Sequence, residues 1–563
     1  MLSPVIRRNA IELVLLGLTL VFIGLAIAGA VSAYSPVPYW DMWNGYLEFY
    51  VKASSGDFSV WWAQHNEHRI FLARLLFWID FVLFRGTGAF LVLMNFVLLG
   101  AICAVFVVIW RERSGGGAGL FLAAWLFSWS QESNLTWGFQ SQFMLALLLP
   151  LLAFYLLHRG VSDVRRSSRY FLMASVCGLL AIGSMANGVI ALPLMTLFAL
   201  LTRSGWRRCG ALAVLSVLGI LLYFHGYFSP EDHGSLRQAF LAHPTGLLLF
   251  AITYVGGPFG YLFSGSAKAL LIAQIAGVCL TFAAIGFAWN ALRKPKQSTL
   301  QLAMLLFILY VGGTALGTAG GRLSFGIEHA LSSRYMTPSL AAWAALMVLA
   351  VPPMQARARR LADALLLILL VALLPQQLKT LEPKHDGLFE RDVAALAIEL
   401  GIKDQAQITH VFPSAEWALS VAEVPVERNL SIFGMSPLAD LRERLGASSG
   451  MEELPATACL GHVDEVHEIK EDPGFAQLRG WVSDGTSEAK PGVLTVVDEG
   501  MSVVGFLYGG QRRPDVVRVM GARALESGFK GYLRSASLDK PVYILGPNLQ
   551  CQLKAALVTS PKD

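Results

Sequence analysis

The chain has 563 residues, of which 55% are hydrophobic and 15% are charged, and its mean hydropathy is +0.54. Because a soluble globular protein carries about 25% charged residues, this composition excludes a wholly soluble protein. The formal net charge is +5. No basic tract with interleaved aromatic residues occurs in the sequence, so we expect no nucleic-acid partner.

The deficit in charge is uneven along the chain. Residues 10–375 consist of apolar runs separated by short polar loops, whereas residues 376–563 have an ordinary soluble composition. A membrane domain followed by a water-exposed domain is therefore predicted. The first apolar run covers residues 11–33 and follows Arg7 and Arg8. It is longer than the core of about 7–15 residues in a signal peptide, and it predicts an uncleaved transmembrane helix.

Six short segments collect Arg and Lys, as the cytoplasmic loops of membrane proteins do. They are Arg7–Arg8, Arg111–Arg113, Arg159–Arg169, Arg203–Arg208, Arg293–Lys296 and Arg357–Arg360. If all six face the cytoplasm, an even number of spans separates each neighbouring pair. The apolar runs then predict a polytopic α-helical membrane domain over residues 1–375, with about eleven spans. The last span places the C-terminal domain on the non-cytoplasmic side.

Two apolar runs are left out of this span count. The run 70–84 is short and contains Arg74 and Asp80, so it is predicted to lie in the outer interface of the membrane. The run 246–263 contains residues that disfavour a regular helix, namely Gly256, Gly257, Pro258 and Gly260. This second run is predicted to be a broken or re-entrant segment.

The first outer loop, about residues 34–89, is the longest loop of the predicted membrane domain. It begins with Asp41 between Trp40 and Trp43. In one interpretation Asp41 is a solvated loop acid and the two tryptophans belong to the interfacial aromatic belt. In the other, Asp41 is a catalytic carboxylate whose partly dry surroundings tune its proton affinity. The residues alone leave both interpretations open.

A dense polar stretch follows in the same loop and contains His65, Glu67, His68 and Arg69. Imidazole and carboxylate groups are suitable metal ligands, although this spacing matches no standard zinc motif. The same side chains suit hydrogen bonding to a polar substrate. The stretch therefore allows a divalent metal without requiring one.

The second outer loop alternates amides, hydroxyls and aromatic rings, with Glu132, Asn134, Trp137 and Gln140 among them. Amides bond sugar hydroxyls, and aromatic faces stack on the C–H face of a sugar ring. The alternative is that these polar groups make interhelical hydrogen bonds near helix ends. Both interpretations are kept.

A third polar group occurs late in the membrane domain. Its candidate substrate-binding residues are Arg322, Glu328, His329, Arg334 and Tyr335. An Arg at the outer mouth of a span can form a fork with phosphate oxygens. The alternative is a snorkelling Arg at a helix end, but the surrounding polar residues favour phosphate binding.

The soluble part is predicted to contain a linking α/β segment, 376–455, and a β-sandwich-like domain, 456–563. Residues 388–400 have helical spacing, and 408–412 is a strand candidate. Later strand candidates are 477–482, 493–497, 502–507, 528–533 and 542–545, with a hairpin turn at Asp498-Glu499-Gly500. Short strands separated by Gly and Pro suggest a sandwich.

The six cysteines fall into two groups. Cys103, Cys177, Cys209 and Cys279 lie in or beside predicted spans and are expected to be packing residues. Cys459 and Cys551 lie near the two ends of the strand-rich region. In an oxidising compartment these two can form a disulfide, which we predict.

The arrangement of these features resembles the GT-C superfamily of membrane glycosyltransferases, which use polyprenyl-phosphate-linked sugars as donors. Its members combine many spans with an acid in a long first outer loop, an interfacial helix after it, and an extracytoplasmic C-terminal domain. Asp41 matches the position of the catalytic acid. The stretch Ser333-Arg334-Tyr335 resembles a donor-phosphate contact of many members.

The resemblance is incomplete in the first loop. Several members carry two adjacent acids, whereas Asp41 is followed by Met42. The catalytic acid therefore stays open between Asp41 and Glu67. The C-terminal domain resembles the carbohydrate-binding β-sandwich of some bacterial members, including arabinofuranosyltransferases of cell envelopes and pili.

The resemblance implies an inverting hexosyl- or pentosyltransferase of the bacterial inner membrane. It would move a sugar from a polyprenyl-phosphate donor to an extracytoplasmic glycan or protein acceptor, with membrane lipid around it. The acceptor hydroxyl would lose its proton to Asp41, and Arg334 with Arg322 would hold the charge of the leaving phosphate.

The alternative function is a transporter or flippase of a lipid-linked sugar, and an assembly protein without catalysis is a third. Transporters place polar groups near the bilayer midplane and often show repeated halves. In this sequence the polar groups cluster at one predicted face, and no internal repeat is visible. This pattern favours the enzyme.

Overall fold

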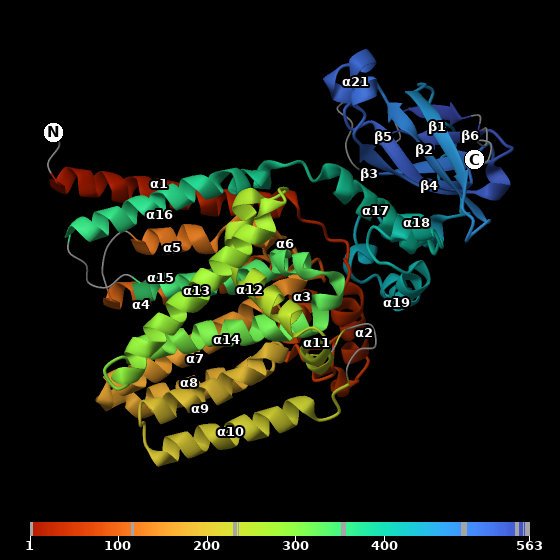
Figure 1. Cartoon of the computed structure of the whole chain (residues 1–563). Helices are drawn as coiled ribbons and strands as arrows, with labels where there is room; N and C mark the ends of the chain where they lie inside the picture. The colour runs from red at the N-terminus through yellow and green to blue at the C-terminus, as the bar shows by residue number, and fades with distance from the viewer. Residues whose placement is uncertain are drawn as a thin grey trace. The chain divides into compact units, whose positions relative to one another are not determined.

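The structure, a computed structural model, describes residues 4–113, 118–228, 234, 236–350, 356–485, 492–546, 551–555 and 557. The chain forms two compact units (Figure 1). The helical unit consists of Met1–Tyr34, Ser59–Leu76 and Ala89–Glu382. The C-terminal unit consists of Ser35–Phe58, Phe77–Gly88 and Pro383–Asp563. The first outer loop is thus divided between the two units. The predicted domain boundaries at residues 375 and 455 stay predictions.

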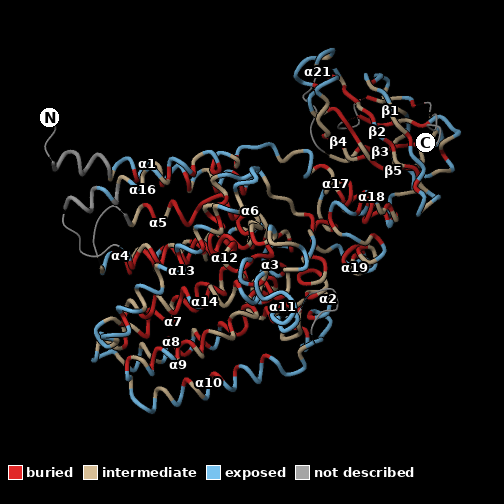
Figure 2. The backbone as a smooth tube through the Cα atoms, viewed as in Figure 1, coloured by how far each residue is buried: buried red, intermediate tan, exposed pale blue. Residues whose placement is uncertain are grey.

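Eight helices in the described part of the chain are long and apolar enough to cross a membrane. They include most or all of α1 (Pro4–Ser32), α4 (Ala89–Arg113), α7 (Ser141–Ser162), α10 (Trp206–Phe224), α12 (Pro244–Gly260), α13 (Lys268–Arg293), α14 (Thr299–Arg322) and α16 (Ala356–Leu378). Much of α10 is exposed (Figure 2). Its exposed side chains are hydrocarbons, such as Leu218, Leu221 and Leu222. Such surfaces are costly in water and compatible with a multi-pass membrane protein.

Shorter helices complete the helical unit. They are α5 (Ala118–Leu126), α6 (Glu132–Thr136), α8 (Ser167–Ile182), α9 (Ala191–Leu201), α11 (Leu236–Ala242) and α15 (Met336–Ala350). The segment 118–134 does not form one continuous helix, because α5 ends at Leu126. Ser128 then caps a 3₁₀ turn, η3 (Trp129–Gln131), and Gln131 donates to the carbonyl of Leu126. Polar side chains that bond the local backbone compete with helix propagation.

The predicted break within 246–263 is also wrong, because α12 continues through its glycines and Pro258. A Cβ at Gly256 would lie 1.8 Å from the Ala273 carbonyl oxygen, and one at Gly277 would lie 2.0 Å from that of Ile252. These glycines therefore serve the close crossing of α12 and α13, as small residues do between membrane helices. Both ends of α12 lie beside the segment 323–331. Gly246 is next to Leu323, and Tyr261 donates to the Leu331 carbonyl.

Helix α3 (Phe71–Phe84) has 14 residues and is not one of the eight long helices. Its two charged side chains, Arg74 and Asp80, are buried. Arg74 donates to the Ala63 carbonyl, and Asp80 accepts from the Gly88 N–H and the Tyr46 hydroxyl. The exposed side chains of α3 are apolar: Leu75, Ile79, Val82, Leu83 and Phe84. This face favours a lipid environment, and the predicted interfacial position of the helix stays a prediction.

The C-terminal unit begins in the first outer loop with a π-helix, η1 (Trp43–Glu48), and α2 (Phe49–Ser54). Its later helices are α17 (His385–Leu400), α18 (Gln405–Ile408), α19 (Ala415–Glu427), α20 (Leu441–Arg444) and α21 (Pro514–Met520). Helix α17 confirms the helix predicted over 388–400. The strand predicted over 408–412 is wrong, because Asp404 caps α18 by accepting from the Gln407 N–H.

Seven antiparallel strands form one sheet in the described part of the C-terminal unit, in the order β1-β2-β5-β4-β3-β6-β7. The strands are β1 (Leu460–Glu468), β2 (Phe475–Ser483), β3 (Gly492–Asp498), β4 (Val503–Gln511), β5 (Gly528–Arg534), β6 (Val542–Leu545) and β7 (Gln552–Ala555). All five later strand predictions fall on these elements, and the turn at 498–500 joins β3 to β4. A sandwich would have two sheets, whereas here one continuous sheet is formed.

The two edges of this sheet meet beside a disulfide. The Cys459 N–H donates to the Gln552 carbonyl at 2.8 Å, and the Gln552 N–H donates to the Thr457 carbonyl at 3.0 Å. Cys459 and Cys551 are bonded, with their Cα atoms 5.1 Å apart. The predicted disulfide is thus confirmed, and it links the chain leading into β1 to the chain leading into β7.

Candidate functional site

In the helical unit, the polar stretch of the first outer loop folds into a tight turn. His65 and His68 exchange main-chain hydrogen bonds of 2.8 and 2.9 Å, and Asn66 between them has a φ of 48°. Arg69 holds this turn in place, since it is only 5% exposed. Its three guanidinium nitrogens donate to the carbonyls of Trp62, Tyr223 and His225 at 2.6–2.8 Å. Arg69 therefore acts as an anchor for the loop.

The two histidines are packed rather than free. His65 is buried against the ring of Phe139, with 5.2 Å between centroids. Burial, followed by the positive charge of Arg74 and by His68, lowers the pKa of His65 to about 3, so the ring stays neutral at physiological pH. His68 accepts a hydrogen bond from the Ala186 N–H at 3.4 Å.

Glu67 is brought to the end of α14 by this turn. Its carboxylate lies 3.3 Å from Nη2 of Arg322, and both side chains are about one-fifth exposed. The Glu67 carbonyl accepts a hydrogen bond from the Tyr223 hydroxyl. Glu67 and Arg322, far apart in the sequence, thus form one charged pair that is open to an incoming ligand.

The segment after α14 contributes His329 and a second arginine, Arg334. It consists of three 3₁₀ turns, η8 (Leu323–Phe325), η9 (Ile327–Leu331) and η10 (Ser333–Tyr335). Burial lowers the pKa of His329, and the positive charges of Arg334 and Arg322 lower it further. His329 therefore lies within electrostatic reach of both arginines. Glu328 beside it is exposed.

Arg334 has the environment expected of a ligand-binding arginine. Its guanidinium lies over the Tyr335 ring at 5.3 Å, and that ring stacks on Tyr254. Its Nε is buried and has no hydrogen-bond partner among the described residues. A buried donor without a partner is rare and calls for an explanation, and an anionic ligand would supply one.

The second outer loop fixes the backbone at Arg334. Asn134 donates from Nδ2 to the Arg334 carbonyl at 2.8 Å and to the Thr337 hydroxyl at 2.7 Å. The Thr337 hydroxyl in turn donates to Gln131 at 2.6 Å. Asn134 is fully buried. Its amide therefore makes hydrogen bonds between helices, which was the alternative to sugar binding for this loop. Sequence reasoning did not single out Thr337 or Gln131.

The other predicted residues of this loop have different surroundings. The Trp137 carbonyl accepts from Nδ2 of Asn95, and the Trp137 ring lies 5.7 Å from Phe139. Gln140 is 1% exposed, and its Oε1 has no partner within the described part of the chain. Glu132 is half-buried. Among the described residues, Gln140 therefore keeps an acceptor without a hydrogen bond.

Asp41 belongs to the C-terminal unit. Trp40 before it has a φ of 48°, and its N–H donates to the Val411 carbonyl at 2.9 Å. The Asp41 carbonyl accepts from the Gly45 N–H at 2.8 Å, at the start of the π-helix η1. Left-handed non-glycine residues and π-helices both concentrate at functional sites. Asp41 lies between the left-handed residue Trp40 and the π-helix η1.

Tyr223 is a residue that sequence reasoning missed. Its hydroxyl bonds the Glu67 carbonyl, and the Arg69 N–H donates to that hydroxyl at 3.2 Å. A tyrosine at the end of an apolar run resembles a residue of the interfacial belt, so the sequence gives no signal for this role.

With respect to metals, no three His, Cys, Asp or Glu side chains in the described ranges are grouped so as to hold an ion.

Comparison with known proteins gives no family for this chain. No protein-family model matches the sequence, and no curated protein matches it either.

Proposed function

We propose that the protein is an inverting membrane glycosyltransferase that moves a sugar from a polyprenyl-phosphate donor to an extracytoplasmic glycan or protein. The observation that carries this proposal is the Glu67–Arg322 pair at the end of the apolar helix α14, with His329 within electrostatic reach of both Arg322 and Arg334. A lipid phosphate in a membrane needs this combination of cationic donors beside a hydrocarbon environment.

In this mechanism the arginines serve the leaving group. Arg334, with its unused Nε, and Arg322 bind the donor phosphate through charge-assisted hydrogen bonds. The acceptor oxygen attacks the anomeric carbon and its proton passes to a carboxylate. The bond between that carbon and the phosphate oxygen breaks, and the phosphate leaves with the electron pair. The arginines stabilise the charge that develops there.

Asp41 is the proposed base, and Glu67 is the alternative. Glu67 already has a cationic partner in Arg322. A phosphate that binds Arg322 would displace Glu67, so we assign Glu67 the role of balancing the arginine charge before the donor binds. Asp41 is flanked by the strained Trp40 and by η1, which supports its assignment to the chemical step.

The location and topology belong to the same proposal. We place the protein in a bacterial inner membrane, with about eleven spans, GT-C-like connectivity, a cytoplasmic Arg165–Arg169 segment and the C-terminal unit outside. The basic segments and the Cys459–Cys551 disulfide support this, since disulfides persist in oxidising compartments. Reporter fusions after residue 400 test it, and a cytoplasmic signal there would overturn the topology.

One experiment tests the activity directly. The purified full-length protein, in lipid bilayers, is incubated with a panel of polyprenyl-phosphate sugars and candidate acceptors. Release of polyprenyl phosphate that depends on acceptor supports the proposal. Movement of intact lipid-linked sugar between leaflets, without release, would instead support the flippase.

A further inference from the structure

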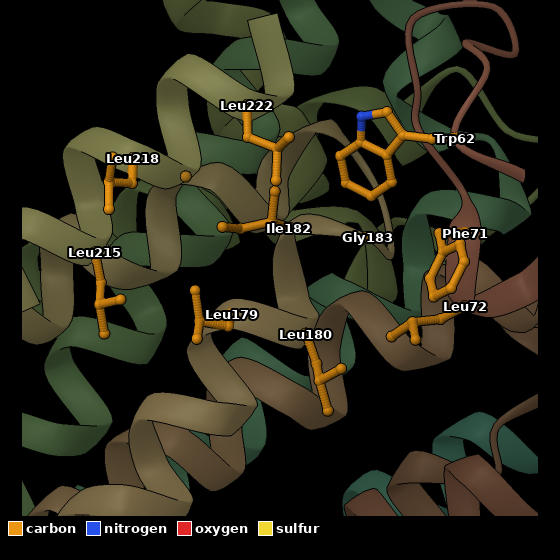
Figure 3. A pocket seen from close by; sticks show the side chains of 11 residues that line it. Trp62, Phe71, Leu72, Leu179, Leu180, Ile182, Gly183, Leu215, Leu218 and Leu222 are labelled. Atoms are coloured by element: carbon orange, nitrogen blue, oxygen red, sulfur yellow. The ribbon is translucent and has the colours of Figure 1, made fainter. Parts of the chain in front are cut away.

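The described surface of the sheet-forming part of the chain carries few large apolar side chains. In the helical unit such side chains are expected at the surface, and Leu218 and Leu222 beside the hollow in Figure 3 are examples. The sheet has its own apolar core, so polar side chains are expected outside it. Among the described residues after 383, three large apolar side chains are exposed, namely Leu460, Val519 and Leu525. Two of the three lie in the connection between β4 and β5, and such clustering calls for an explanation.

This connection, residues 514–525, forms a compact tip. It consists of α21, a left-handed Gly521 with a φ of 83°, and η13 (Ala522–Ala524). Val516 and Ala524 are buried, with exposures of 6% and 3%, whereas Val519 on the same helix as Val516 is 83% exposed. One side of the tip is therefore packed on the sheet unit, and the other presents an apolar side chain to the surroundings.

Arg513 fixes the base of this tip. Its main-chain N–H donates to the Leu525 carbonyl at 2.7 Å. Its guanidinium donates to Asp515 of α21 and to Asp464 of β1, each at 2.6 Å. These bonds tie both ends of the tip to the sheet. A tip that is already ordered loses little further freedom when it binds a partner.

The charges of the tip suit an anionic surface. Asp515 is the one acid of residues 514–525, and its carboxylate is paired with Arg513. Arg518 and Arg523 are both exposed, on either side of the most exposed part of the tip. An apolar side chain flanked by arginines is typical of segments at a membrane surface, where the apolar group enters the lipid boundary and the arginines meet phosphate groups.

The connectivity of the chain brings a bilayer within reach of this tip. One candidate span ends at Ser32, and the C-terminal unit begins at Ser35. Another candidate span ends at Leu381, and the unit resumes at Pro383. Two such short connections keep the unit close to the membrane. Lipid is therefore favoured over a soluble protein as the partner of the tip.

We propose that the tip 514–525 is a membrane-docking element for a bilayer that contains anionic phospholipid. Val519 and Leu525 enter the boundary between headgroups and acyl chains, and Arg518 and Arg523 bind phosphate groups. Docking gives the sheet a fixed orientation toward the bilayer. This inference does not depend on transferase activity.

The test uses the full-length protein in nanodiscs made of equal parts of phosphatidylcholine and phosphatidylglycerol. Val519→Cys carries an environment-sensitive fluorophore, in a background where alanine replaces the free cysteines Cys103, Cys177, Cys209 and Cys279. A lipid with a nitroxide near the headgroup end of its acyl chain quenches any label that enters the bilayer. We expect the label at position 519 to be quenched and its emission to shift to shorter wavelength.

Glu499→Cys is the matched labelling control. Glu499 is exposed in the turn between β3 and β4, at the opposite end of β4 from the tip, so its label should not be quenched. Equal quenching at the two positions, or none at position 519, would overturn the proposal.

The role of charge is tested by Arg518→Ala in the labelled protein. The ratio of docked to undocked tip should fall about fivefold, since one basic side chain near an anionic surface contributes a factor of this size. Arg428→Ala is the control, because Arg428 is exposed at the end of α19, and it should leave the ratio unchanged. An unchanged ratio in Arg518→Ala would overturn the assignment of anionic lipid.

Trypsin gives a second measurement on the unaltered chain. Cleavage after Arg518 and Arg523 should be slower in the mixed nanodiscs than in nanodiscs of phosphatidylcholine alone. Cleavage after Arg428 should proceed at the same rate in both. If the tip were cut equally fast in the two lipids, the proposal would be overturned even with a quenched label at position 519.

Discussion

At the scale of residues, two arginines predicted to bind substrate have opposite environments. Every guanidinium nitrogen of Arg69 donates to a main-chain carbonyl, so its hydrogen bonds hold the loop. The Nε of Arg334 is buried without a partner in the described part of the chain, while Asn134 fixes its carbonyl. A fixed backbone with an unused donor is suited to ligand binding, because little further ordering is needed.

Arg334 should therefore be sensitive to charge geometry. Arg334→Ala is expected to weaken donor binding about 10- to 100-fold, since hydrogen bonds to charged groups contribute roughly 1.5–3 kcal/mol each. Arg334→Lys should be intermediate, because it keeps the charge but loses the planar fork. Binding of polyprenyl phosphate and turnover are the measurements. Arg293→Ala at the end of α13 is the control, and unchanged binding in Arg334→Ala would return Arg334 to a snorkelling role.

The base is tested by a pair of isosteric changes. Asp41→Asn should fold and bind donor but lose about 10²–10⁴-fold in turnover, because the amide cannot accept the acceptor proton. Glu67→Gln should alter donor affinity more than the chemical step, since Glu67 pairs with Arg322. Single-turnover kinetics separate binding from chemistry. Near-normal turnover in Asp41→Asn with abolished turnover in Glu67→Gln would exchange the two roles.

At the scale of elements, the crossing of α12 and α13 shows that glycines in an apolar run are compatible with two different structures. The same residues that suggest a broken helix can permit a close helix pair, and only the partner helix distinguishes the cases. The Ala273 carbonyl lies where a Cβ of Gly256 would be. Helix α12 also contacts Met336, at the start of α15, through Gly257, so this crossing supports the chain just after Arg334.

Gly256→Ala should destabilise the helical unit by about 1–3 kcal/mol, the usual cost of overpacking. The backbone of α13 must move to admit the methyl group, because the obstructing atom is a carbonyl oxygen. Thermal unfolding in detergent measures the effect. Gly286→Ala on α13 is the control, since a Cβ there meets nothing within 4 Å. Equal stability of the two variants would mean that the helices are not packed as closely as described.

At the scale of the whole molecule, the two candidate acids belong to different compact units. Asp41 is part of the C-terminal unit, whereas Glu67, Arg322 and Arg334 are part of the helical unit. Within the C-terminal unit, Arg391 of α17 lies 3.9 Å from the centre of the Tyr39 ring, which joins the Asp41 segment to the C-terminal helices. Damage to the C-terminal unit should therefore affect Asp41 directly.

The disulfide offers such a perturbation. Cys551→Ser removes a bridge between residues 92 positions apart and should destabilise the C-terminal unit by about 4–5 kcal/mol in the chain-entropy account. Hydrogen exchange of β1 and β7 in the full-length protein measures this loss. Cys279→Ser, at an exposed free cysteine, is the control. Unchanged exchange in both variants would show that the sheet edges are held without the bridge.

Features that depend on local sequence pattern could be predicted before the structure was known. Apolar runs predicted most of the long helices, short runs of strand-forming residues predicted the five strands β2 to β6, and two cysteines in the soluble part predicted their own bridge. These succeed because hydrophobic periodicity is set by neighbours along the chain. The sequence also found Glu67, Arg322 and Arg334 as separate candidates.

Which of these residues contact one another could be seen in the folded protein alone. It paired Glu67 with Arg322, turned Arg69 into an anchor through Tyr223, and assigned the segment around Asp41 to the C-terminal unit. It also showed that Gly256 makes room for α13. Such outcomes depend on packing between segments that are distant in the sequence. The local sequence of one segment does not identify the segment that will pack against it.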